Sequence, residues 1–443
     1  MNKRILFSGR PSLRSLTILG ICLLACTSAC KKDGQPPQPV VISSISPATG
    51  AFGTIVTITG SGFNANASGD SVKFNGVGAL VQNASDTLLI VEVPKAAGTG
   101  PVTVQSGGQS GTGPVFNFIY TITVSTLAGS GTPGFTDGNG STAQFNSPSG
   151  VATDVQGNIY VADYNNNRIR KITQAGVVST LAGSGTAGFA DGNGSTAQFN
   201  GPFGIATDTH GNIYVADFVN QRIRKISPAG VVSTLAGSTP GFTDGSGISA
   251  QFSYPTGVAA DGQGNIYVAD SFNQRIRKIS PAGVVSTLAG SIYGFADGNG
   301  STAQFKYPEG VATDVQGNIY VGDQTNNRIR KITPAGDVST FAGSTQGFAD
   351  GNGTSAKFYA PLGVATDARG DIYVADSFNQ RIRKISPAGE VITLAGTAAG
   401  GFADGSGSAA KFYAPEGVAT DAQGNNIYVA DAQNNRIRLI TIQ

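Results

Sequence analysis

A Pro-x-Gly-(Val/Ile)-Ala motif occurs six times after residue 140, and its second residue differs from copy to copy. Two copies carry a glutamate there, Glu309 and Glu416. Because a carboxylate can hold a hard divalent cation or transfer a proton, these are the positions where the repeated part could perform chemistry. One hypothesis is therefore a metal-dependent hydrolase or lyase. The six variable residues are Ser149, Phe203, Thr256, Glu309, Leu362 and Glu416.

Aromatic residues are unevenly distributed around this motif. Tyrosines precede the proline only in the last four copies, and other rings occur at Tyr164, Phe218, Phe272 and Phe378. An aromatic, weakly charged rim suits stacking on a sugar ring or a peptide better than binding an anionic polymer. Alternatively, the rings only cover apolar loop surface. The predicted ligand-binding set is Phe203, Tyr254, Tyr307, Glu309, Tyr359, Tyr413 and Glu416.

Residue types that usually catalyse reactions are scarce in this sequence. The one histidine, His210, stands in a turn where other copies have glutamine or arginine, and we interpret it as incidental. The Asp-Gly-Asn-Gly-Ser string at 137–141 resembles half of a calcium loop, but Pro148 takes the place of the acid expected at the twelfth position. We therefore expect no catalytic residue, no protein-bound metal and no cofactor.

The elements that carry these residues repeat along the chain. An Ile-Tyr-Val-(Ala/Gly)-Asp run recurs at spacings of 53 to 55 residues, and each unit contains four strand-like runs, which is typical of a β-propeller blade. Residues 124–128 match the fourth run, whereas the last unit stops after three runs. We therefore predict a six-bladed propeller over 124–443, closed by this N-terminal strand. The aspartates of the run are Asp163, Asp217, Asp270, Asp323, Asp376 and Asp431.

Three details of the repeat carry further predictions. The pair Asp163 and Arg168 recurs in every unit, which predicts a loop-fixing ion pair in each blade. The run 168–172 breaks strict alternation, which a bulge near Lys171 could reconcile. Phe135 and Phe145 also recur in every copy, and we expect both to anchor loops.

The units resemble NHL repeats, through the Pro-x-Gly-(Val/Ile)-Ala motif, the Gly-Asn-Ile-Tyr-Val-Ala-Asp run and Asn-Arg-Ile-Arg-Lys-Ile. The resemblance implies the propeller fold and leaves function open, since such propellers include protein-interaction platforms, RNA readers, extracellular sensors and lyases. The histidines that hold zinc in the lyases have no counterpart here. A gluconolactonase-like site built on Glu309 or Glu416 is the enzyme alternative.

Residues 40–120 read as short strands separated by Gly, Asn and Pro turns, which favours a β-sandwich. The strings 45–50, 53–63 (Gly-Thr-Ile-Val-Thr-Ile-Thr-Gly-Ser-Gly-Phe), 72–76 and 91–94 resemble an IPT/TIG domain. The resemblance implies an immunoglobulin-like fold and a role as spacer or protein-contact module. The predicted fold class is all-β, with an immunoglobulin-like sandwich followed by the propeller.

Residues 1–30 have the layout of a secretory signal, with four basic residues before an apolar stretch that is too short to span a bilayer. The surroundings of Cys30 (or Cys26) resemble bacterial lipoprotein signals, which implies a lipid anchor at one of them, followed by a polar linker at 31–39. Cleavage removes four of 29 basic and none of 27 acidic residues, so the net charge becomes −2.

The leading hypothesis is thus an anchored binding protein of the bacterial cell envelope, either periplasmic or on the cell surface. We expect it to be a monomer that captures a glycan or a protein of the envelope or exterior. Its charge balance makes nucleic acid an unlikely partner, because phosphate backbones require clustered positive charge. A purely structural envelope scaffold is a third hypothesis.

Overall fold

The computed structural model describes residues 38–95 and 97–443 and consists almost entirely of β-strands. The expected signal peptide, Cys26, Cys30 and most of the 31–39 linker lie outside the described residues. None of the helices in the described part is long and apolar enough to cross a membrane. The short 3-10 helices are η1 (Ala67–Gly69), η2 (Tyr164–Asn166), η3 (Gly247–Ser249), η4 (Ser271–Asn273), η5 (Gln324–Asn326), η6 (Gly353–Ser355), η7 (Ser377–Asn379) and η8 (Ala432–Asn434).

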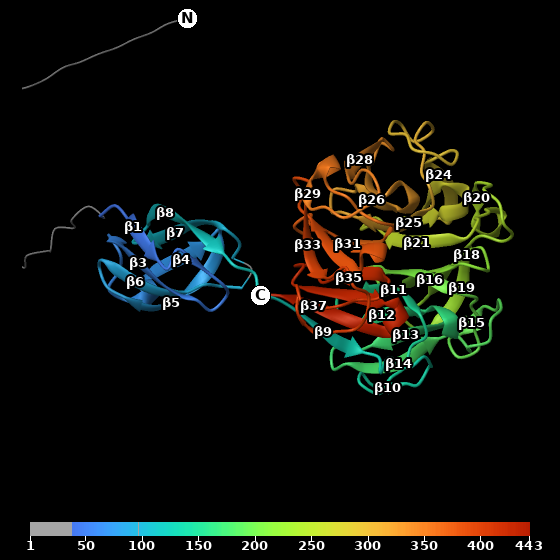
Figure 1. Ribbon diagram of the computed structural model, residues 1–443, viewed down its shortest axis with the longest axis horizontal. Helices are drawn as coiled ribbons and strands as arrows, with labels where there is room; N and C mark the ends of the chain where they lie inside the picture. The colour runs from blue at the N-terminus through green and yellow to red at the C-terminus, as the bar shows by residue number, and fades with distance from the viewer. Residues whose placement is uncertain (1–37, 96) are drawn as a thin grey trace, which may run out of the picture.

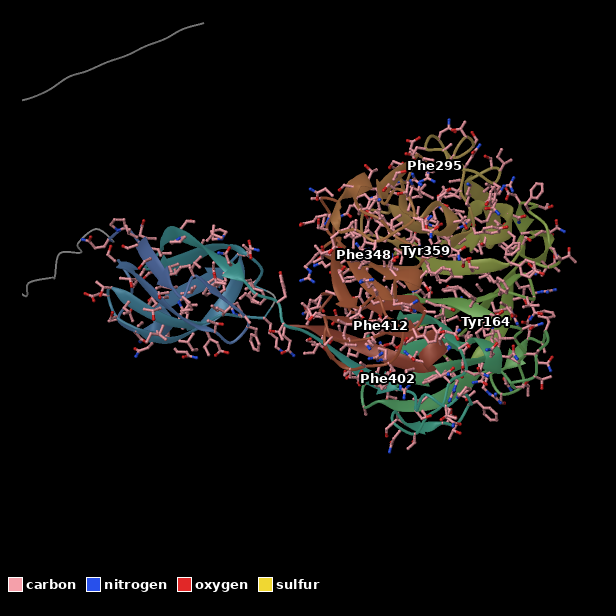
Figure 2. All side chains as sticks on the ribbon, viewed as in Figure 1. Tyr164, Phe295, Phe348, Tyr359, Phe402 and Phe412 are labelled. Carbon is pink, nitrogen blue, oxygen red and sulfur yellow. The ribbon has the colours of Figure 1, made fainter. Side chains whose placement is uncertain are left out.

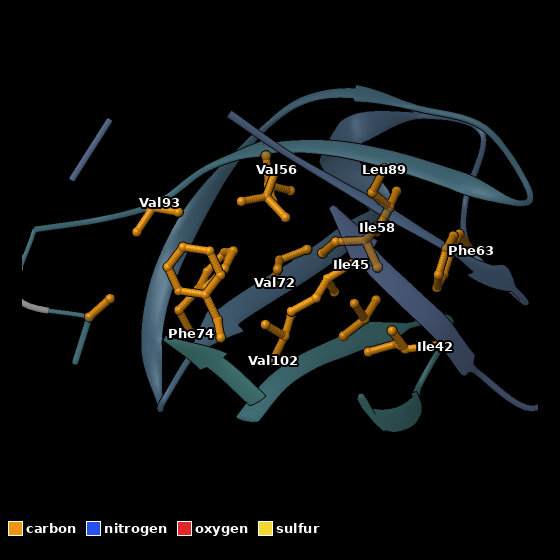
Figure 3. Close-up of a cluster of buried hydrophobic side chains, with 14 of the residues drawn as sticks. Ile42, Ile45, Val56, Ile58, Phe63, Val72, Phe74, Leu89, Val93 and Val102 are labelled. Atoms are coloured by element: carbon orange, nitrogen blue, oxygen red, sulfur yellow. The ribbon is translucent and has the colours of Figure 1, made fainter. Parts of the chain in front are cut away.

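The N-terminal domain is the expected immunoglobulin-like sandwich, whose strands pair in the order β1-β3-β6-β5-β4-β7-β8-β2. Alternate residues of these strands face one apolar core (Figure 3), where Phe74 and Phe116 meet edge to face with ring centroids 5.0 Å apart. The strands are β1 (Val41–Ser46), β2 (Thr49–Gly50), β3 (Ile55–Ser61), β4 (Asp70–Phe74), β5 (Val77–Ala84), β6 (Leu88–Glu92), β7 (Gly100–Ser106) and β8 (Gln109–Phe118).

The rest of the chain forms six antiparallel sheets arranged around a common axis (Figure 1), which confirms the six-bladed propeller. The innermost strand of each blade contacts the innermost strands of both neighbouring blades. From the axis outward, blade 1 contains β11 (Pro148–Thr153), β12 (Ile159–Asp163), β13 (Arg168–Ile172), β14 (Val177–Ala182) and the short β10 (Gly138–Asn139).

The next three blades repeat this order. Blade 2 contains β16 (Pro202–Thr207), β17 (Ile213–Asp217), β18 (Arg222–Ile226), β19 (Val231–Ala236) and β15 (Gly192–Asn193). Blade 3 contains β21 (Pro255–Ala260), β22 (Ile266–Asp270), β23 (Arg275–Ile279), β24 (Val284–Ala289) and β20 (Gly245–Ser246). Blade 4 contains β25 (Pro308–Thr313), β26 (Ile319–Asp323), β27 (Arg328–Ile332) and β28 (Val338–Ala342).

The last two blades complete the ring. Blade 5 contains β30 (Pro361–Thr366), β31 (Ile372–Asp376), β32 (Arg381–Ile385), β33 (Glu390–Gly396) and β29 (Gly351–Asn352). Blade 6 contains β35 (Pro415–Thr420), β36 (Asn426–Asp431), β37 (Arg436–Ile442), β9 (Ile122–Ala128) and β34 (Gly405–Ser406).

Strand β9 comes from the start of the propeller and pairs with the last strand, β37, as predicted. Val124 lies opposite Ile440 and Ile122 opposite Ile442. This pairing covers two strand edges that could otherwise template aggregation. Short turns join strands one to two and, in blades 1 to 5, strands three to four on one face of the ring, whereas the loops after the second strands and the long connections between blades lie on the opposite face, here called the loop face. Because β9 begins on the short-turn face, the three residues that join the two domains enter the ring opposite the loop face.

The predicted Asp163–Arg168 ion pair is wrong, because Asp163 binds Arg170 instead. Arg170 Nη1 lies 2.7 Å from Asp163 Oδ2, and both side chains are fully buried. Arg168 donates to the Ser184 carbonyl at 3.0 Å. The predicted bulge near Lys171 is present, between Ile169 and Arg170 in the pairing of β13 with β14. It lets Ile169 and Arg170 both be buried, so the arginine reaches the aspartate inside the blade.

Candidate functional site

The six variable residues of the Pro-x-Gly motif lie in a ring at the mouth of the central channel. In each blade the pairing of the innermost strand with its neighbour shifts register between the proline and the third residue after it, as between Pro148 and Val151. A bulge of this kind re-aims side chains that regular pairing would alternate. Every blade has the same bulge, so the backbone presents six positions equally and only the side chains differ.

Two members of the ring serve the frame rather than a ligand. Ser149 and Thr256 are buried, and their hydroxyls donate to backbone carbonyls of the next blade, Ser149 to Phe203 at 3.0 Å and Thr256 to Glu309 at 3.2 Å. Phe203, Glu309, Leu362 and Glu416 line the channel. The cavity there measures about 60 Å³, room for about two waters and too small for a sugar ring. A larger ligand must therefore sit above the mouth.

The two channel glutamates share this poorly hydrated environment. Burial raises the pKa of Glu309 to about 8, with a further contribution from the charge of Glu416, and burial alone raises the pKa of Glu416 to about 7. Ser271 Oγ lies 3.4 Å from Glu309 Oε1, whereas Glu309 Oε2 is buried with no partner among the described residues. At neutral pH the pair therefore carries less than two negative charges and can offer a carboxyl proton.

The donor set around the channel bears on the metal alternative. Within residues 38–95 and 97–443, no group of three or more histidine, cysteine, aspartate or glutamate side chains is arranged to hold a metal ion. Divalent cations of the magnesium and calcium type take six or more oxygen ligands. Glu309 and Glu416 alone do not supply such a set.

The four candidate tyrosines fall into two structural classes. Tyr254 and Tyr307 stand directly before the proline and adopt left-handed backbone angles, with φ of 49° and 50°. Their amides donate to glutamines of the preceding blade, as from Tyr307 to Gln274 Oε1 at 2.7 Å. The equivalent left-handed positions in the other blades are Ser147, Gly201, Ala360 and Ala414.

Tyr359 and Tyr413 stand one residue earlier, at an ordinary frame position. Their amides donate to the buried aspartates of their own blades, Asp376 and Asp431, each at 2.8 Å. Asn146 makes the same hydrogen bond in blade 1. The four tyrosines that the sequence analysis grouped before the proline therefore occupy two different backbone sites.

Tyr254 and Tyr307 belong to a continuous series of aromatic rings, here called the aromatic arc. Neighbouring ring centroids along it are 4.7 to 6.4 Å apart, and the series crosses blades 1 to 4. Three of its seven members come from the loops after the second strands. The arc consists of Tyr164, Phe203, Phe218, Tyr254, Phe272, Tyr307 and Tyr293.

The arc ends before blades 5 and 6. Tyr359 pairs with Phe378 at 5.0 Å, and among the described residues neither ring pairs with a member of the arc. Tyr413 is half exposed. Figure 2 shows Tyr164 and Tyr359 nearer the centre of the ring than Phe295 and Phe402. The loop face is thus aromatic on one side and less so on the other.

Sequence reasoning missed Tyr293, which extends the arc in the connection before blade 4. The available signal was that the other five copies have no aromatic residue at this position. It also overstated Phe135, which is 56% exposed, whereas Phe145 is buried as a loop anchor should be. His210 is exposed in its turn and lies 3.9 Å from Asp208.

Comparisons with known proteins agree with this architecture. Residues 39–120 match the IPT/TIG domain, and the NHL repeat matches six segments. Among curated proteins, Protein SUPPRESSOR OF QUENCHING 1, chloroplastic, of Arabidopsis thaliana is 32% identical over 288 residues, covering 58% of this chain and 27% of that protein. NHL repeat-containing protein 2 of Gallus gallus is 28% identical over 67% of this chain and 46% of its own length. The chain thus spans less than half the length of these relatives. The six NHL segments are 145–172, 199–226, 252–279, 305–332, 358–385 and 412–438.

Solved structures from Bacteroides share the whole two-domain arrangement. A protein of unknown function from Bacteroides thetaiotaomicron aligns with a TM-score of 0.67 at 22% identity, covering 92% of this chain and 99% of that chain. An auxiliary nutrient binding protein from Bacteroides ovatus aligns with a TM-score of 0.57 at 20% identity, with the same coverage. At these identities the likeness establishes the fold alone.

Proposed function

This chain consists of an IPT/TIG domain followed by six NHL repeats that close into a propeller, and we propose that it is a lipid-anchored binding protein of the bacterial cell envelope. In this proposal the aromatic arc on the loop face captures a glycan through its sugar rings. A protein ligand on the same arc, a metal-dependent reaction at the channel mouth and a purely structural role are the competing outcomes of the test below.

The observation that carries the proposal is the pair of tyrosines in left-handed backbone. Non-glycine residues are uncommon there because the Cβ atom crowds the backbone, and bulky residues are rarer still. Gly201 shows that the same turn forms without a side chain. Tyr254 and Tyr307 therefore occupy their positions against local preference, and their rings extend the arc instead of filling the core.

The arrangement of rings supports a carbohydrate as the ligand. The CH-rich face of a pyranose is flat and apolar, and its hydroxyls need polar partners at the edge. The arc offers flat apolar rings for the sugar face, with the ring centroids of Tyr254 and Phe272 4.7 Å apart. The hydroxyls of Tyr164, Tyr254 and Tyr307 offer polar partners for the sugar hydroxyls. The small channel cavity beside it would hold water or one substituent.

Three features support a location on the cell envelope: the expected lipid anchor, the linker and sandwich that act as a spacer, and the side on which the sandwich joins the propeller. Lipidation at Cys30 (or Cys26) would tether the chain, and the linker and sandwich would hold the propeller away from the membrane. Because the sandwich joins on the short-turn face, the loop face stays unobstructed by it. The names of the Bacteroides structures, two of them auxiliary nutrient binding proteins, are in keeping with capture of a nutrient.

The test is affinity electrophoresis of the full chain in detergent through gels that contain yeast mannan, dextran or xylan. We expect one polymer to retard the chain, and the double variant Tyr254→Gly and Tyr307→Gly to be retarded much less. The matched control is Tyr413→Ala, which removes a tyrosine outside the arc. Retardation that the double variant leaves unchanged would refute the site, and a protein-only ligand would appear as retention by none of the gels.

Elemental analysis of the same preparation tests the enzyme alternative. A stoichiometric divalent ion that is lost in Glu309→Gln or Glu416→Gln, together with no retardation, would move the function to the channel mouth. We expect no stoichiometric ion, because the described residues supply only two carboxylates there.

A further inference from the structure

Surface grooves recur at the outer rim of the propeller, between the outer strand of one blade and the loop that begins the next. They are called here the rim grooves. Three of them measure about 490, 540 and 750 Å³, within the range of small-molecule sites. Each contains the same phenylalanine, aspartate, arginine and threonine positions, as in the groove with Phe135, Asp137, Arg168 and Thr180. The largest groove is also lined by Tyr120, Thr121 and Ile122, at the junction of the two domains.

Every blade has an exposed phenylalanine at this position, and in three blades it lines one of the grooves above. The six side chains are 44 to 60% exposed, whereas the nearby Phe145 is buried. Each ring lies on an arginine of strand three, at 3.9 to 4.6 Å from guanidinium carbon to ring centroid, and part of the ring remains open to solvent. The six are Phe135, Phe189, Phe242, Phe295, Phe348 and Phe402.

Polar groups surround this ring at fixed places. Asp137 is half exposed and lies 2.6 Å from the buried Arg170, and its counterparts repeat the contact at 2.5 to 2.6 Å. Although partial burial opposes it, hydrogen bonds from Thr180 and Arg170 hold the pKa of Asp137 below its usual value. Each groove thus combines a flat apolar platform with an ionised acceptor, an arginine and a hydroxyl.

We propose that the rim grooves are six equivalent sites for a pyranose unit, through which the propeller binds a carbohydrate polymer along its circumference. The free face of each phenylalanine stacks on the CH face of one sugar, the aspartate accepts from a hydroxyl and the arginine donates to another. These sites are separate from the aromatic arc, so their existence does not depend on the arc being a site.

Identity among the six copies fits a repeating ligand. A single asymmetric molecule can use one groove only, whereas a polymer presents the same unit many times and can occupy several grooves at once. Each further contact then forms at high effective concentration, so weak single sites give strong overall binding. Each groove contributes one phenylalanine, so a short oligosaccharide would bind the rim in about six equivalents.

The experiment compares polymer and short ligand on the full chain. Gels containing yeast mannan, dextran or xylan identify the polymer that retards it, and oligosaccharides of that polymer provide the short probe. The rim variant carries Phe189→Ala, Phe295→Ala and Phe402→Ala, in alternate blades. We expect it to lose affinity for the polymer by at least about tenfold and to bind about half as many equivalents of the short probe.

A second variant set keeps the result interpretable if the alanines disturb the blades. Leucine at the same three positions still covers the arginine but has no flat face, and we expect it to weaken polymer binding as much as alanine does. Full binding by the leucine set would overturn the proposal, as would failure of all three polymers to retard the chain. If the arc variant abolishes all retention while the rim variant retains it, the rim sites are refuted and the arc proposal stands.

Discussion

The inside of the blades and the mouth of the channel were built from the same six repeats, yet they differ in how they vary. Inside the blades, the arginine and aspartate of each copy lie 2.6 to 2.7 Å apart with both side chains buried. At the mouth, one backbone bulge presents six positions with five residue types. The six copies are thus identical where buried ion pairs stabilise each blade. They differ at the channel mouth, where side chains can contact a ligand.

The uniform part can bury charge because it leaves few hydrogen-bonding groups of the arginine unused. Arg277 donates to Asp270, to the Gln251 carbonyl and to Asp244, and its guanidinium lies over the ring of Phe252. A buried ion pair survives only when extra hydrogen bonds offset the loss of hydration. The invariance of this network among the copies follows from that requirement.

The largest effect should come from breaking this network. Arg277→Met leaves Asp270 buried without its partner, and we expect the free energy of unfolding to fall by about 3–5 kcal/mol. The matched control, Arg275→Met in the same strand, removes a partly exposed arginine that donates to one carbonyl, and should cost less than about 1 kcal/mol. Urea unfolding followed by circular dichroism measures both. Equal losses would show that burial of the pair is not what stabilises the frame.

The fold was predictable from the sequence because its information is repeated. Six copies of Ile-Tyr-Val-(Ala/Gly)-Asp fix the blades, and the unmatched run at 124–128 fixes the closure. The site was less predictable, because it depends on backbone details that single residues do not reveal. Alternation could not show that Arg170, and not Arg168, turns inward, since a bulge in the pairing with β14 decides it.

The tyrosines show the same limit at the level of one residue. Tyr307 directly precedes its proline, and Tyr359 lies two residues before its own. From the sequence alone, this small difference does not predict different surroundings. A shift of one position places Tyr307 in left-handed backbone on the arc and Tyr359 at a frame amide beside Phe378. The distinction rests on a turn whose left-handed residue can be serine, glycine, alanine or tyrosine.

The next prediction concerns ligand binding, which should depend on Tyr254 and Tyr307 more than on Tyr359 and Tyr413. We expect the pair Tyr254→Ala and Tyr307→Ala to weaken binding of the retarding polysaccharide by about 2–3 kcal/mol, because two adjoining rings leave the arc. The pair Tyr359→Ala and Tyr413→Ala should cost less than about 1 kcal/mol. Dissociation constants from affinity gels of graded polymer concentration compare them. An equal loss for both pairs would mean that the ligand also contacts Tyr359 and Tyr413, outside the aromatic arc.

The third effect is the pH dependence of stability at the mouth. The folded-state pKa of Glu309, about 8, lies above its unfolded value of 4.5, so its contribution to stability is complete below pH 4.5 and is lost as pH rises through 8. We expect the free energy of unfolding of the native chain, relative to Glu309→Gln, to fall by up to about 4 kcal/mol between pH 5 and pH 9. Parallel pH profiles of the two proteins would show that Glu309 ionises freely.

The smallest expected effect is the change in stability caused by Tyr254→Gly. It is informative because it distinguishes a tyrosine that binds the ligand from one that stabilises the fold. Tyr254→Gly removes a side chain from a left-handed position, which favours the folded backbone, and frees the unfolded chain, which opposes it. With part of the ring exposed, we expect the free energy of unfolding to change by less than about 1 kcal/mol while ligand binding weakens. Thermal unfolding and affinity gels on one preparation measure both. A loss of stability as large as that of Arg277→Met would place Tyr254 in the frame, and the arc would then be a structural feature of the ring.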